Sequence, residues 1–296
     1  MSTSNKYVLN DQTLITDSGK SLLSKIVTNT DDSVYCFLPN IPSVIPAAAM
    51  ARLSRRAGDL RLCLLDEFLP EIEAIASSSP ESDNENIKSG ELISRILTEY
   101  GDDSVAQLIN IPFVVENCSN LMTKKLEWGR IGAYLEQSTR YIYFDKVNQT
   151  GNYNFYIPKE LNEDQSKEYI KIMNQIFSNY SVIVKNITEY LRNKIKEPEQ
   201  KSERLAWLAS TRAQACDAVR TLLPVATQST VGLVLSAQAI DNLIVRLQSE
   251  DLIESKEIAT KILREVRKVA PNFFERTDRP DRGLATSAYL KENGRN

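Results

Sequence analysis

The segment on which the fold assignment depends reads Glu127-Trp128-Gly129-Arg130-Ile131-Gly132-Ala133-Tyr134-Leu135-Glu136-Gln137-Ser138-Thr139-Arg140-Tyr141. In an extended chain alternate side chains share a face, so Glu136, Ser138 and Arg140 are expected on one side. A carboxylate, a hydroxyl and a guanidinium placed together can bind a sugar hydroxyl and a phosphate, because arginine matches phosphate oxygens with a planar fork. A surface strand with a Glu136–Arg140 ion pair has the same spacing, so the pattern alone leaves both interpretations open.

The chain of 296 residues contains no histidine. This excludes imidazole bases, histidine-dependent nucleophile pairs and histidine metal ligands. The four cysteines form no CxxC pair, so we expect no metal site. If the protein is an enzyme, a cofactor or carboxylate and arginine chemistry must carry the reaction.

The charge and hydropathy patterns exclude two further classes. A net charge of −3 does not indicate non-specific binding to the phosphate backbone of nucleic acids. The first 30 residues are polar, and no apolar stretch approaches the length of a membrane span. We therefore expect a cytoplasmic protein with reduced thiols.

Hydrophobic periodicity predicts many helices and few strands. The clearest helix is expected at 163–192, where apolar residues follow the three-and-four spacing of one buried stripe. Other helices are expected at 47–56, 59–76, 87–100, 116–128, 202–222, 236–247 and 253–269, strands at 109–115 and 231–235, strand character at 141–144 and 153–157, and a polar loop at 77–86. Without regular βαβ alternation, GxGxxG or a P-loop, the prediction is α+β, helix-rich with a small, mostly antiparallel sheet. We divide the chain into an N-terminal extension (1–40), one domain (41–275) and a polar tail (276–296).

The run from Glu136 to Tyr141 resembles the end of the signature of the flavin-dependent thymidylate synthases, which opens with Arg-His-Arg and closes with Ser-x-Arg-Tyr. The closing part is intact at Ser138, Arg140 and Tyr141, whereas the opening part reads Trp128-Gly129-Arg130. Similar segments occur in the same order at 101–107, 153–158 and 220–224 and in the helix from residue 236, so the resemblance covers roughly residues 45–275. The segments 126–130, 133–137 and 278–283 are most similar to the first unit of a subgroup that carries two such units in tandem.

The resemblance implies a flavin-dependent thymidylate synthase-like fold and the reductive methylation of dUMP to dTMP, with methylenetetrahydrofolate as carbon donor, reduced FAD as hydride donor and NADPH as reductant. It implies no protein nucleophile. It assigns nucleotide binding to Glu136, Ser138, Arg140, Arg220 and Arg246, and FAD binding to Ser104, Gln107, Arg130, Gln238 and Asn242. It also implies a homo-oligomer, a tetramer in the family, whose sites combine several subunits.

The departures from the family pattern leave alternatives open. Two of three basic signature residues are absent, and Gln238 stands where the family has an arginine, so charge-assisted hydrogen bonds of about 1.5–3 kcal/mol each are lost. The chain could therefore be a catalytically drifted nucleotide-binding or scaffold unit, a relative that alkylates another uridine-type nucleotide, or a helical interaction protein without a small ligand. Single residues also have structural interpretations: Glu136 as the partner of Arg140, Arg220 as the complement of a helix dipole, Ser104 as an N-cap, Asn242 with a local partner and Trp128 as a core or interface residue.

Overall fold

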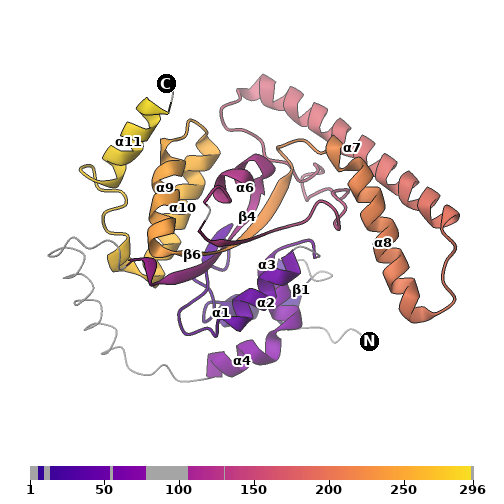
Figure 1. Ribbon diagram of the computed structural model, residues 1–296, viewed down its shortest axis with the longest axis horizontal. Helices are drawn as coiled ribbons and strands as arrows, with labels where there is room; N and C mark the ends of the chain where they lie inside the picture. The colour runs from indigo at the N-terminus through magenta and orange to yellow at the C-terminus, as the bar shows by residue number, and fades with distance from the viewer. Residues whose placement is uncertain (1–5, 10–13, 54–55, 78–105, 130, 295–296) are drawn as a thin grey trace.

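A four-stranded antiparallel sheet forms the centre of the molecule (Figure 1). The computed structural model describes residues 6–9, 14–53, 56–77, 106–129 and 131–294. The strands lie in the order β3 (Val34–Cys36), β4 (Asn110–Ser119), β6 (Gln228–Ser236) and β5 (Ala133–Glu136), and a separate pair joins β1 (Val8–Leu9) to β2 (Leu14–Ile15). The predicted α+β class with a small antiparallel sheet is confirmed.

Both faces of the sheet are buried because apolar residues point to each side in turn. On β4, Phe113 and Val115 face one core and Val114 faces the other. One face is covered by α9 (Ala237–Ser249) and α10 (Ile253–Val269), the other by α1 (Asp17–Leu23), α2 (Val44–Leu53), α3 (Leu60–Glu67) and α4 (Leu69–Ser77). Gly232 permits the close approach of α2, since a Cβ there would lie 2.8 Å from Met50 Cγ.

Strand β4 continues further than the sequence predicts. The expected helix over 116–128 is replaced by the end of β4 and the short helix α6 (Asn120–Leu126). The reason is a buried carboxylate: Glu116 accepts hydrogen bonds from Tyr35 Oη at 2.6 Å and Leu60 N at 3.0 Å. A register shift between Val115 and Cys118 follows it, and burial raises the pKa of the Glu116 carboxyl.

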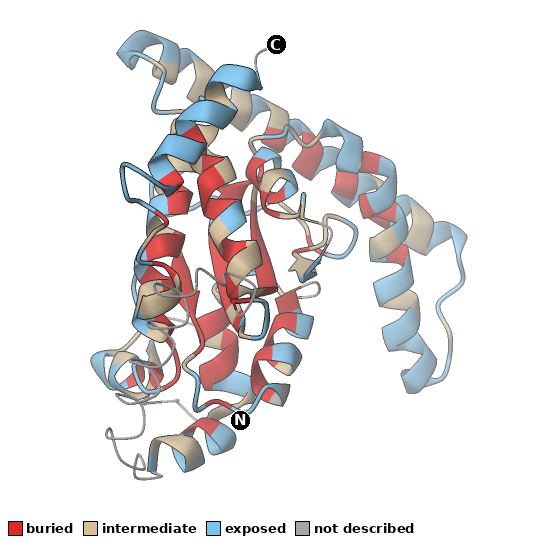
Figure 2. Ribbon diagram, turned by 60° about the vertical axis from the view of Figure 1, so that its left-hand side comes forward, coloured by how far each residue is buried: buried red, intermediate tan, exposed pale blue. Residues whose placement is uncertain are grey.

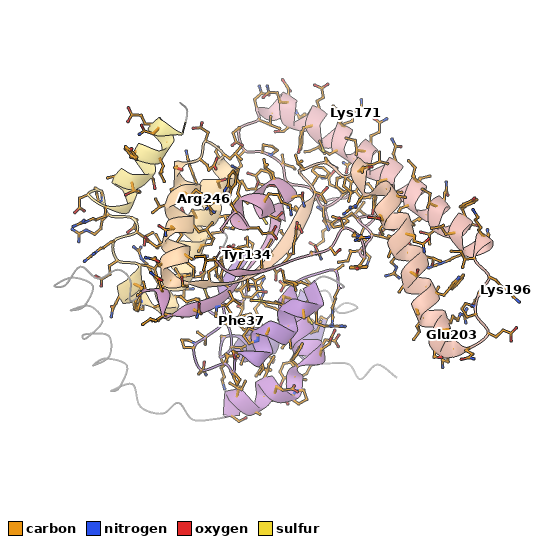
Figure 3. All side chains as sticks on the ribbon, viewed as in Figure 1. Phe37, Tyr134, Lys171, Lys196, Glu203 and Arg246 are labelled. Atoms are coloured by element: carbon orange, nitrogen blue, oxygen red, sulfur yellow. The ribbon has the colours of Figure 1, made fainter. Side chains whose placement is uncertain are left out.

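Two antiparallel helices, α7 (Glu163–Lys194) and α8 (Lys201–Val219), form an arm that extends from the body (Figure 1). The helix predicted at 163–192 is confirmed, and the one predicted at 202–222 ends as the 3₁₀ turn η2 (Arg220–Leu222). The middle of α7 and the C-terminal end of α8 share an apolar core that includes Tyr180, Val184 and Cys216. The outer end, labelled by Lys196 and Glu203 in Figure 3, is largely exposed in Figure 2.

The segments with predicted strand character at 141–144 and 153–157 belong to no named strand, so these predictions are wrong. The second segment makes isolated bridges at Tyr153 and Phe155. Both rings instead pack against Phe177 of α7, with centroid distances of 5.5 Å and 5.8 Å. Aromatic packing under the arm therefore fixes this segment in place of a continuous ladder.

The chain ends also pack onto the fold. The expected extension over 1–40 supplies edge strand β3 and buried residues such as Leu23 and Ile26. The expected tail over 276–296 contains α11 (Gly283–Asn293), which follows the turn η3 (Pro271–Phe273) and packs on α9, where Ser287 Oγ donates to Val245 O at 2.9 Å. The helix expected at 87–100 and nearly all of the loop expected at 77–86 lie outside the described residues. Among the helices that are described, none combines the length and apolar character needed to cross a bilayer.

Candidate functional site

A cavity of about 530 Å³ opens where the end of β5 meets α6 and the inner end of α8. We call it the anion cavity; it is lined by Asn120, Lys124, Glu136, Gln137, Ser138, Thr139, Arg140, Arg220, Thr221, Leu223, Pro224 and Thr227. Four of the five residues predicted to bind a nucleotide therefore lie around one space. Glu136 lies on β5, Ser138 and Arg140 on the turn that follows it, and Arg220 on η2, more than 75 positions further along the chain.

Glu136, the last residue of β5, is held by α6. Its carboxylate accepts hydrogen bonds from Asn120 Nδ2 at 3.0 Å and Thr123 Oγ1 at 2.9 Å, and it pairs with Lys124 Nζ at 2.5 Å. Lys124 also reaches Glu127 Oε2 at 3.3 Å. These partners of Glu136 are all on α6, and the Glu136–Arg140 ion pair considered from the sequence is not the pairing that the structure shows.

The chain turns after Glu136, so the expected extended face is wrong beyond that residue. Ser138 forms the turn: its hydroxyl accepts from Arg140 N at 3.2 Å, and its carbonyl accepts from Tyr141 N at 3.3 Å. Serine hydroxyls compete for backbone N–H groups in this way and favour turns over strands. The turn still leaves Glu136, Ser138 and Arg140 on the wall of the same cavity.

The two arginines of the anion cavity meet at one carboxylate. Asp217 Oδ1, in the last turn of α8, lies 3.2 Å from Arg140 Nε and 3.1 Å from Arg220 Nε. All three side chains are roughly half exposed, with exposed fractions of 54% for Arg140, 45% for Arg220 and 42% for Asp217. The pair of guanidiniums is therefore both fixed and open to a ligand.

A second cavity, of about 470 Å³, lies between β5, β6 and α9. We call it the amide cavity; its polar lining includes Gln107, Asn110, Gln238, Asn242, Tyr134 and Arg246, and its apolar lining includes Leu126, Ile131, Leu235 and Leu243. It brings together three of the predicted FAD residues, Gln107, Gln238 and Asn242. Ser104 and Arg130 lie outside the described residues.

Arg246, which we predicted on the nucleotide side, lines the amide cavity. Its Nη2 donates to Lys125 O at 3.1 Å, and burial lowers the pKa of its guanidinium. Tyr134 lines the same cavity, and burial raises the pKa of its hydroxyl; Figure 3 labels both residues. Among the described lining residues, Arg246 is the one cation.

The glycines of the signature segment allow the chain to fold closely over Tyr134. A Cβ at Gly132 would lie 2.0 Å from Leu235 Cδ2 and 3.0 Å from Tyr134 Oη. The neighbouring apolar side chains face outward: Trp128 is 70% exposed and Ile131 is 85% exposed. Trp128 is thus not a core residue of this chain.

Sequence reasoning missed two cavity residues, Lys124 and Tyr134, and it missed Asp217, which pairs with both arginines of the anion cavity. Asp217 precedes Arg220 by three positions on a predicted helix, and that spacing is a recognisable ion-pair signal. Lys124 has the same spacing from Glu127, but its contact with Glu136, on another element, has no local signal.

Comparison with known proteins identifies the family. The model of the family described as thymidylate synthase complementing protein matches residues 47–272. A UPF0159 protein of Chlamydia pneumoniae is 33% identical over 263 residues, which cover 88% of this chain and 49% of the relative. A flavin-dependent thymidylate synthase of Clostridium tetani is 25% identical over 184 residues, covering 61% of this chain and 67% of the relative.

Among solved structures, the flavin-dependent thymidylate synthase of Helicobacter pylori in complex with FAD and dUMP is similar with a TM-score of 0.44 and 17% identity, covering 70% of this chain and 91% of that one. The chain spans about half the length of the UPF0159 proteins that it matches. The family match extends over most of the chain and includes both cavities. The chain belongs to the thymidylate synthase complementing protein family, the family of the flavin-dependent thymidylate synthases.

Proposed function

We propose that the anion cavity binds the phosphate of dUMP or a related pyrimidine nucleotide, and that the chain serves the reductive methylation of that nucleotide. The observation that carries the proposal is the convergence of Arg140 and Arg220, from separate elements, on one carboxylate beside Ser138 and Glu136. Paired guanidiniums suit a phosphate monoester, because their planar N–H groups match its oxygens. Glu136 supplies carboxylate oxygens in reach of a ribose hydroxyl.

The relative position of the two cavities supports the same proposal. Tyr134 lines the amide cavity and Glu136 lines the anion cavity, and both belong to β5. Residues two apart on a strand point to the same face and are separated by about 7 Å. A nucleotide whose phosphate occupies the anion cavity can therefore extend its base along β5 toward the amide cavity.

The amide cavity fits the ring of a flavin better than its diphosphate. Leu126, Leu235 and Leu243 offer apolar walls for a flat ring, and the amides of Gln238 and Asn242 offer donors and acceptors for its edge. Arg246 is the single described cation available to an anionic part of the cofactor. When bound, reduced FAD supplies the hydride of the reductive methylation, with methylenetetrahydrofolate and NADPH as co-substrates.

Exposed apolar residues beside the amide cavity support a homo-oligomer with shared sites. Trp128 and Ile131 leave most of their surface to solvent in the single chain. Large exposed apolar side chains next to a cavity are typical of surfaces that a partner covers. A tetramer, as the family resemblance implies, is the proposed assembly.

Calorimetric titration of the purified protein with dUMP, with and without FAD, tests the proposal together with the visible spectrum. We expect dUMP binding, a flavin absorption band after reconstitution, and dUMP-dependent oxidation of reduced flavin. Protein that binds dUMP but gains no flavin supports the second candidate, a nucleotide-binding scaffold unit. The structure favours that candidate through one feature, the neutral Gln238 in the amide cavity. Absence of dUMP binding in both conditions refutes the nucleotide function.

A further inference from the structure

Asp217 bridges the two guanidiniums of the anion cavity by contacting the Nε atom of each. Its Oδ1 lies 3.1 Å from Arg220 Nε and 3.2 Å from Arg140 Nε, and Arg140 Nη2 donates to its Oδ2 at 3.5 Å. Arg140 stands on the turn after β5, whereas Asp217 is 77 positions further along the chain, on α8. One carboxylate therefore joins the two walls of the cavity.

The edges that Asp217 contacts determine which donors remain. A guanidinium has five N–H groups in a fixed fork. With Arg220 held at Nε, its two Nη groups stay free of this carboxylate, and Arg140 keeps Nη1 and part of Nη2. These outer donors are the ones that match two phosphate oxygens.

Holding the arginines in advance favours ligand binding for two reasons. A free arginine side chain loses rotamer entropy when it binds a ligand, and part of that entropy is already lost in the ion pair before the ligand arrives. Two neighbouring guanidiniums also repel each other, and a carboxylate between them offsets that repulsion.

We propose that Asp217 is a positioning residue of the anion cavity, which keeps Arg140 and Arg220 side by side with their Nη groups turned toward a phosphate monoester. The inference deepens the proposed function and rests on the anion cavity being the phosphate site. Asp217 does not contact the ligand itself and affects binding only by holding the two arginines.

Two competing accounts make opposite predictions. An exposed ion pair with no role in binding contributes little to the stability of the fold, and its loss leaves the affinity for phosphate unchanged. A carboxylate whose main effect is repulsion of the phosphate gives tighter binding when it is neutralised. The positioning role gives weaker binding on neutralisation, and recovery when the negative charge is restored by a longer side chain.

The test compares Asp217→Asn and Asp217→Glu with the wild-type chain by calorimetric titration with inorganic phosphate and, separately, with dUMP. The matched control is Asp281→Asn, because Asp281 also lies between two arginines, 3.2 Å from Arg279 Nε and 3.9 Å from Arg282 Nε, and lines neither cavity. We expect Asp217→Asn to weaken both ligands by about tenfold. Asp217→Glu should recover most of that loss, and Asp281→Asn should match the wild type.

A second measurement ties the effect to the arginines. In an Arg140→Ala background, Asp217→Asn should weaken phosphate binding by about threefold or less, because one of the two arginines that Asp217 positions is already absent. Unchanged or tighter phosphate binding by Asp217→Asn, or absence of phosphate binding by the wild type, overturns the positioning role. Wild-type protein that binds phosphate but not dUMP refutes the proposed function, while the phosphate series still decides the role of Asp217. Melting temperatures of all variants show whether each is folded.

Discussion

The anion cavity and the amide cavity share strand β5 but differ in how they hold charge. In the first, Lys124, Arg140 and Arg220 are each matched to a carboxylate of the same chain. In the second, Arg246 lies among amides and leucines and donates a hydrogen bond to a backbone carbonyl, Lys125 O. The comparison teaches that a single chain can assemble a charged site by internal ion pairs, whereas the neighbouring site must draw its selectivity from shape and neutral hydrogen bonds.

The largest expected effect removes a cation from the anion cavity. Arg140→Ala should weaken dUMP by about tenfold to a hundredfold, because charge-assisted hydrogen bonds contribute about 1.5–3 kcal/mol. Calorimetric titration measures it. Arg204→Ala is the matched control, since Arg204 is a similarly exposed arginine that pairs with Glu197 on the arm. If Arg140→Ala binds dUMP with wild-type affinity, the anion cavity does not depend on its arginines and the proposed difference between the cavities is wrong.

The second effect concerns the packing of the amide cavity. Gly132→Ala places a methyl group against Leu235 and should lower the free energy of unfolding by about 1–3 kcal/mol, the usual range for overpacking. Urea denaturation measures the loss. Leu235→Ala alone should also destabilise the fold, because Leu235 is buried, but the double change should lose less than the sum of the two single losses, since it removes the clashing Cδ2 atom. Strictly additive losses argue against the predicted contact.

The third effect comes from a substitution that makes the amide cavity more cationic, as the anion cavity is. Gln238→Arg adds a second cation to the lining and should tighten FAD by about tenfold, through a charge-assisted hydrogen bond or attraction to the diphosphate. Titration followed by the flavin absorption band measures the change. Gln214→Arg, on the exposed surface of α8, adds the same charge elsewhere. Equal gains in the two variants point to net charge and not to the cavity.

The smallest expected effect is the salt dependence of ligand binding, which should differ between the two cavities. The arginines of the anion cavity are half exposed, so ions screen their attraction for phosphate. Raising the salt from about 50 mM to about 500 mM should weaken dUMP by a few-fold and leave flavin ring binding, measured with riboflavin, nearly unchanged. Equal salt sensitivity in the two titrations contradicts the proposed difference in chemistry.

The helices were the most predictable part of the fold. The stripes of α7 and α10 are long and regular, so 253–269 was predicted with the observed bounds. The end of β4 was missed because Glu116 reads as a polar helix residue, and only the folded chain supplies its partners Tyr35 and Leu60. Local pattern carries no information on such distant partners.

The candidate site divides in the same way. Residues close in sequence, such as Ser138 and Arg140, could be grouped from their spacing together with the family resemblance. The placement of Arg246 and the bridge made by Asp217 depend on how α8 and α9 pack, which no local pattern contains. The nucleotide and FAD roles of the individual residues stay predictions.

The arm has a practical consequence for experiments on this protein. Its inner end holds Asp217 and Arg220, while the connection between Lys194 and Lys201 lies at the opposite end of the 19-residue helix α8, roughly 28 Å away. A fluorophore or affinity handle attached at that connection sits far from both cavities. Such a label can report tumbling or assembly of the protein while leaving ligand binding undisturbed.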